Sequence, residues 1–173
     1  MSFSFLSCAH SPRSFPLSTK EVGILKHLAS KTTTTDILEY RLTPAQRSTK
    51  ELLTYLAHSS WRQAELVITG DMSLFADLDA VMQAFDPATF DATIDANWNH
   101  VKGLIQGLSD TQLNETVTLF GRFSNTRINF LVEWCFGQLM AYKMQLFLQL
   151  KQAGRSELAT PNLWMGVDKA DQS

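Results

Sequence analysis

The segment FLVEWCFGQLMAYKMQLFLQLKQAG, residues 130–154, determines the expected fold class. It contains no proline and is about seven turns long if it is helical throughout, at roughly 3.6 residues per turn. Its apolar residues provide more apolar surface than a solvated helix needs: Leu131, Trp134, Cys135, Leu139, Met140, Phe147 and Leu150. Such a helix lies largely inside a bundle, and Gly154 is placed to end it.

Capping signals divide the rest of the chain into further helices. Ser18-x-x-Glu21 and Ser48-x-x-Glu51 are capping boxes, and they predict helices from about 19 to 40 and from about 48 to 69. Asp86-Pro87 predicts a third helix from about 87 to 107. Threonines at 32–35 are poor helix formers, so two shorter pieces with a loop between them are the alternative to one first helix.

Four long helices with mostly short connections predict an all-α protein, a four-helix bundle with one long crossover connection between the third and fourth helices. The bundle domain is expected to span 18–155. A loose, serine-rich arm precedes it at 1–17, and a polar C-terminal tail follows at 156–173. In that tail, Leu163, Trp164 and Met165 are available to pack back onto the bundle.

Composition limits the function classes. The chain has 173 residues, 45% of them apolar and 18% charged, with a net charge of −2. These values fit a globular domain and predict neither a nucleic-acid nor a membrane partner. The two cysteines form no disulfide framework, which favours a reducing, cytoplasmic location. Polar residues within the last helix exclude a transmembrane segment there.

Two lines of polar residues follow helix faces. The line on the last helix consists of four residues spaced four, three and four positions apart: Gln138, Tyr142, Gln145 and Gln149. The line on the second helix consists of four residues spaced three, four and three positions apart: Tyr55, His58, Arg62 and Glu65. Each line shares one helix face. Either the two lines face each other across a pocket, or they are solvated faces on which Arg62 and Glu65 form a weak surface pair.

Two segments resemble the DinB/YfiT-like superfamily. TPAQRSTKELLTYLAHSSW, residues 43–61, is similar to that family's second helix, written roughly E-L-L-x-H-L. GQLMAYKMQLFLQLKQAG, residues 137–154, is similar to its last helix, roughly H-x-x-x-H-x-x-Q-L. The resemblance extends over about 18–155 and implies a four-helix bundle with a long crossover, in agreement with the helix pattern.

The resemblance also implies a metal site in which all three ligands are replaced. The family holds a divalent metal, nickel or zinc, with one histidine on the second helix and two on the last. These positions fall on Tyr55, Gln138 and Tyr142, and Gln145-Leu146 matches the following Gln-Leu. Neutral tyrosine and glutamine are weak ligands for these metals. We therefore expect no metal cofactor and no metal-dependent catalysis, with the three side chains hydrogen-bonded to one another where the metal would sit.

Two roles are expected for such a protein. One is binding a small molecule in the residual polar pocket, with His58, Arg62, Glu65 and Gln145 as further lining candidates. The other is a homodimeric structural module, because the last helix has more apolar surface than one intramolecular face needs. The alternative is a metal-dependent hydrolase or thiol transferase that uses a shifted ligand set, His58 with Glu65 or His100.

Overall fold

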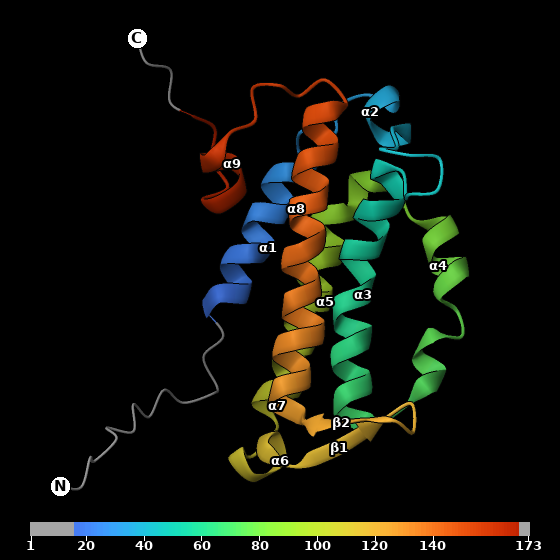
Figure 1. Cartoon of the computed structure of the whole chain (residues 1–173), viewed down its shortest axis with the longest axis vertical. Helices are drawn as coiled ribbons and strands as arrows, with labels where there is room; N and C mark the ends of the chain where they lie inside the picture. The colour runs from blue at the N-terminus through green and yellow to red at the C-terminus, as the bar shows by residue number, and fades with distance from the viewer. Residues whose placement is uncertain (1–15, 170–173) are drawn as a thin grey trace, which may run out of the picture.

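Four helices pack side by side around a shared core in the computed structural model, which describes residues 16–169 (Figure 1). They are α1 (Pro16–Ala29), α3 (Thr49–Thr69), α5 (Phe90–Gln106) and α8 (Gly137–Gln152). Helix α3 contacts both α5 and α8, and α1 closes the bundle against the same two helices. The all-α four-helix bundle predicted from the sequence is confirmed.

The first predicted helix, 19–40, is wrong as one element. The chain forms α1 and a separate short helix, α2 (Thr35–Glu39), with the threonines between them. The Ser30 and Thr32 hydroxyls donate to the carbonyls of His27 and Ala29 and so cap the end of α1. Thr34 is the N-cap of α2 and accepts from the Ile37 amide. Hydroxyl side chains that bond to nearby backbone favour ends over helix interiors, which explains the break.

The capping box predicted for the second helix forms. The Ser48 hydroxyl accepts from the Glu51 amide, and the Glu51 carboxylate accepts from the Ser48 amide. Gly70 ends α3 in the left-handed conformation with a φ of 74°, which glycine adopts without strain. Both ends of α3 are therefore set by local sequence.

Short elements make up the connections. Between α3 and α5 lie η1 (Met72–Phe75), α4 (Leu78–Ala84) and η2 (Pro87–Thr89). The crossover after α5 contains α6 (Asp110–Asn114) and an antiparallel hairpin of β1 (Thr116–Leu119) and β2 (Phe123–Thr126), with Thr116 paired to Thr126 and Leu119 to Phe123. The long crossover was predicted from the sequence, whereas the pairing of its two halves as strands was not.

The last long helix is continuous but not uniform. It begins as α7 (Arg127–Phe130), widens into a π-helical segment, η3 (Leu131–Phe136), and continues as α8. π-Helical turns are rare and occur frequently at functional sites. The wide segment directly precedes Gln138, one of the positions to which the family resemblance points.

The core lies where the four helices meet and leaves a small apolar cavity. The cavity, of about 30 Å³, is lined by Cys135 together with residues of α1, α3, α5 and α8. Burial raises the pKa of the Cys135 thiol to about 12, so this cysteine stays a neutral core thiol at neutral pH. Among the described residues no helix is both long enough and apolar enough to cross a membrane.

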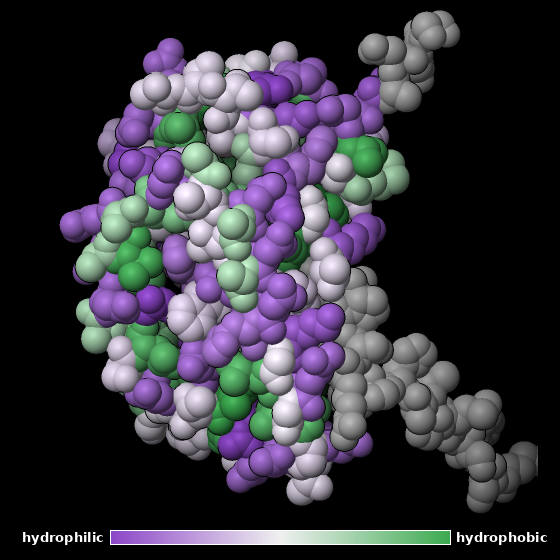
Figure 2. Space-filling model, turned by 180° about the vertical axis from the view of Figure 1, so that it is seen from behind, coloured by the Kyte–Doolittle hydropathy of each residue, from purple (hydrophilic) through white to green (hydrophobic). Residues whose placement is uncertain are grey.

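A short C-terminal helix packs on the bundle. It is α9 (Thr160–Trp164), which contacts α1 and α8. Leu163 is buried there, whereas Trp164 and Met165 are exposed. Seen from behind, hydrophobic residues appear as separate groups among hydrophilic ones (Figure 2).

A buried ion pair joins α8 to α1. The Lys143 ammonium donates to the Glu21 carboxylate, and the two side chains are 3% and 11% exposed. The Trp164 ring of α9 covers the pair, with its centroid 5.0 Å from Lys143 Nζ. Three helices thus converge on one lysine.

Candidate binding site between α3 and α8

The three positions singled out by the resemblance meet between α3 and α8. The Gln138 side-chain amide donates to the Tyr55 hydroxyl. The rings of Tyr55 and Tyr142 pack edge to face, with centroids 4.9 Å apart and planes at 66°. All three side chains are partly buried. Their contacts connect the two helices through polar groups.

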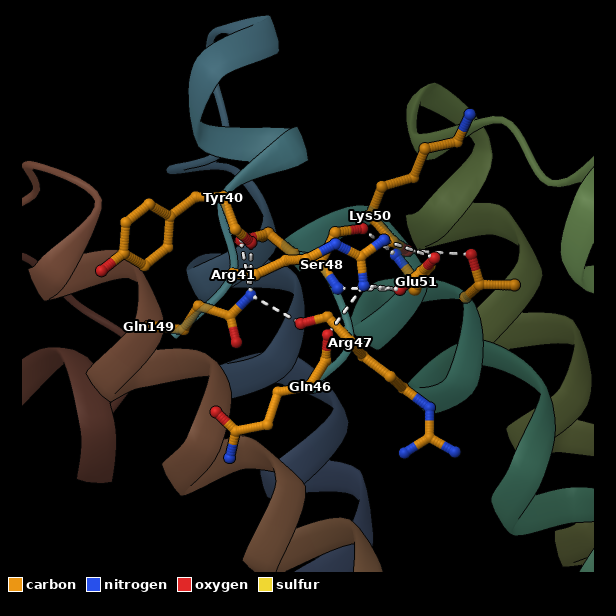
Figure 3. Close-up of polar contacts among 10 residues, drawn as sticks. Tyr40, Arg41, Gln46, Arg47, Ser48, Lys50, Glu51 and Gln149 are labelled. Carbon is orange, nitrogen blue, oxygen red and sulfur yellow. Dashed lines mark hydrogen bonds and ion pairs between the residues drawn. The ribbon is translucent and has the colours of Figure 1, made fainter. Parts of the chain in front are cut away.

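Arg47 completes this site, and sequence reasoning missed it. Its guanidinium lies 4.1 Å from the centroid of the Tyr55 ring and 5.8 Å from that of Tyr142. None of the residues at 16–169 forms a hydrogen bond or ion pair with the guanidinium, which extends away from the polar network of the α2–α3 loop (Figure 3). An arginine in a loop before a helix gives no sequence signal that it stacks on Tyr55 of that helix and on Tyr142 of α8.

Gln149 positions the backbone of Arg47. Its amide nitrogen, at the end of a buried side chain of α8, lies 2.9 Å from the Tyr40 carbonyl, 3.3 Å from the Arg47 carbonyl and 3.0 Å from the Thr49 hydroxyl (Figure 3). One glutamine therefore fixes the loop that carries Arg47 against the far end of α8. The sequence placed Gln149 on the polar line but did not indicate its partners.

The phenol of Tyr55 is neutral at physiological pH. Burial raises its pKa, and the neighbouring Tyr142 raises it further, while Arg47 and the amide of Gln138 oppose this rise only in part. A neutral phenol with a positive guanidinium over its ring is a poor ligand for a divalent cation. Gln138 also turns its amide N–H groups, which are donors, toward Tyr55. The residues present do not fit a zinc or nickel ion.

The other residues of the α3 polar line face different partners. Arg62 is buried, donates to the Leu74 carbonyl, and lies 2.5 Å from the Asp77 carboxylate. Glu65 pairs with His100 at 3.4 Å. The expected surface pair of Arg62 with Glu65 is therefore wrong, because the η1–α4 connection covers Arg62. Both residues therefore have partners other than Tyr55, Gln138 and Tyr142.

His58 does not gather a shifted ligand set. Its ring packs edge-on against Phe85 at 5.8 Å, and burial, with Arg62 nearby, lowers its pKa. Glu65 lies seven residues further along α3, about 10 Å away along the helix axis. Within 16–169, no group of three His, Cys, Asp or Glu side chains is close enough to hold a metal ion. Gln145, the remaining lining candidate, is partly buried on α8 between Tyr142 and Gln149 in sequence.

Comparison with known proteins supports the fold. No protein-family model matches the sequence, and no curated protein matches it. Among solved structures, a DinB-like protein of Bacillus subtilis, YjoA, superposes with a TM-score of 0.63 at 20% sequence identity. The match covers 81% of this chain and 90% of that one. The chain therefore has the DinB-like four-helix fold that the resemblance of residues 43–61 and 137–154 implies.

Proposed function

We propose that this chain is a metal-free, cytoplasmic DinB-like protein that binds a small molecule at the pocket of Tyr55, Gln138 and Tyr142. The hydrogen bond from Gln138 to Tyr55 carries the proposal, because it joins two of the three ligand positions through uncharged groups. Arg47 supplies there, as a fixed guanidinium, the positive charge that a metal would otherwise supply. Recognition in this pocket then relies on hydrogen bonds and ring contacts, without Lewis-acid chemistry.

Equilibrium dialysis of the untagged protein against zinc and nickel tests the metal-free part of this function. We expect no stoichiometric binding of either ion, because neutral tyrosine and glutamine do not compete with water for them. A Tyr55→Phe variant is the matched control and should behave like the native protein. One equivalent of tightly bound metal in the native protein that is lost in the Tyr55→Phe or Gln138→Ala variant would contradict the proposal.

A homodimeric role has separate support on the outer face of α8. Met140, Met144 and Leu148 follow one another at intervals of four residues and are 45%, 37% and 49% exposed. In Figure 1, none of the described elements lies in front of α8. An exposed apolar helix face of this kind favours self-association. Sedimentation should give a dimer at micromolar concentration that dissociates in a Met144→Glu variant, and a native monomer would exclude this role.

A further inference from the structure

A groove beside Gln138 has the dimensions of a ligand site. It lies between α3 and the beginning of α8 and has a volume of about 410 Å³. Its lining residues, which define the Trp134 groove, are Gln63, Glu133, Trp134, Gly137, Gln138 and Ala141. Volumes of roughly 300 to 1,000 Å³ are usual for small-molecule pockets. This space stays open because Gly137 has no side chain and the side chain of Ala141 is a single methyl group.

The Trp134 groove offers hydrogen-bond acceptors and no cation. None of its lining residues is a Lys, Arg or His. Glu133 is exposed and has no ion-pair partner in the described part of the chain. The side-chain oxygens of Gln63 and Gln138 are buried, and no described group donates to either. Both oxygens are inaccessible to solvent, so a ligand in the groove reaches the exposed carboxylate of Glu133 and not these oxygens.

Trp134 gives the groove a fixed aromatic wall. Its ring centroid lies 4.8 Å from that of Phe130, 5.8 Å from that of Phe123 and 6.0 Å from that of Phe120. These contacts come from α7 and the β-hairpin, so two elements hold the indole in place. A held indole next to a carboxylate is suited to an organic cation, because the ring face attracts positive charge.

We propose that the Trp134 groove binds an organic cation with N–H donors, an alkylammonium or guanidinium group, with Glu133 as its counter-ion and Trp134 as its aromatic contact. The exposed carboxylate of Glu133 accepts hydrogen bonds from its N–H groups. Because Gln138 both lines the groove and bonds to Tyr55, this inference rests on the proposed function and extends the ligand-binding region into the groove. Arg47 does not line the groove.

Three probes of matched shape test the charge preference: benzylammonium, benzamide and benzoate. Titration into isotope-labelled protein is followed by NMR through the indole N–H signals of the four tryptophans. The signal of Trp134 is assigned from its loss in a Trp134→Phe variant. Benzylammonium should shift the Trp134 signal to saturation, benzamide more weakly, and benzoate not at all.

Two variants locate the binding, and a third is their control. Glu133→Gln should weaken benzylammonium binding about tenfold, as the loss of a charge-assisted hydrogen bond predicts. Ala141→Phe should abolish binding by filling the groove, and its exposed position leaves the bundle intact. Glu39→Gln removes an exposed carboxylate of α2, at the other end of the bundle, and should leave the affinity unchanged (Figure 1).

Any of the following results would overturn the inference. Equal affinity for all three probes, or loss of binding in Glu39→Gln as large as in Glu133→Gln, would mean that Glu133 does not select a cation. Binding of benzoate that depends on Arg47 would disprove the cation assignment and leave the metal-free pocket standing. If no probe shifts the Trp134 signal, the groove is not a ligand site. Stoichiometric metal binding in dialysis would instead disprove the proposed function.

Discussion

Replacing Tyr55, Gln138 and Tyr142 with histidine, together with Arg47→Ala, is expected to create a zinc and nickel site between α3 and α8. The three positions already lie together, as the Gln138–Tyr55 hydrogen bond and the 4.9 Å ring contact demonstrate. Three neutral imidazoles form an effective set of ligands, so affinity for zinc should rise about a thousandfold or more over the native protein. Calorimetric titration with zinc measures the change directly.

Arg47 has its own expected effect in this experiment. With Arg47 retained, the three-histidine variant should bind metal more weakly, because the guanidinium would remain close to the ion. A variant with histidine at Tyr55 and Tyr142 alone serves as the control and should bind metal poorly. If the full variant folds, as judged by its circular dichroism, and still binds no metal, then these positions are not the metal site of the fold.

A Lys143→Met substitution is expected to destabilise the protein by about 3–5 kcal/mol, the usual cost of breaking a buried ion pair. Glu21 is 8% exposed and would be left without its partner. The substitution retains an unbranched side chain beneath Trp164, so the loss should come mainly from the uncompensated carboxylate. Urea denaturation followed by circular dichroism gives the free energy of unfolding.

The paired change Lys143→Met with Glu21→Leu should recover most of that loss, because replacing both partners removes the buried charge altogether. The pair of Arg155 with the exposed Glu157, 2.7 Å apart, is the control, and a Glu157→Gln substitution should have little measurable effect. A single Lys143→Met variant as stable as the native protein, or a double variant less stable than either single one, would show that the pair does not stabilise the bundle.

Local signals in the sequence were enough for most of the fold. Ser48 with Glu51 set the beginning of α3, Gly70 set its end, and Asp86-Pro87 preceded α5 closely. These signals act within one helical turn, so they can be read without the tertiary structure. The same local chemistry governs the threonine run, where side-chain hydroxyls cap α1 and α2. There, capping outweighed the apolar periodicity that favoured one helix.

The candidate site was less predictable because its contacts are distant in sequence. The family resemblance indicated Tyr55, Gln138 and Tyr142, which the fold brings together. Arg47 lies just before α3, but no local signal places its side chain over the Tyr55 ring, and Gln149 fixes the backbone of Arg47 from α8. Arg62 appeared to belong to a solvated face, since nothing in α3 itself shows that α4 will cover it.

A crystal structure of the untagged protein soaked separately in zinc and nickel tests the central claim most directly. If the pocket is metal-free, no anomalous density should appear between α3 and α8. The Gln138 amide should donate to the Tyr55 hydroxyl, and the Arg47 guanidinium should lie over the Tyr55 ring. A metal ion coordinated by Tyr55, Gln138 and Tyr142, or by His58 nearby, would contradict that claim.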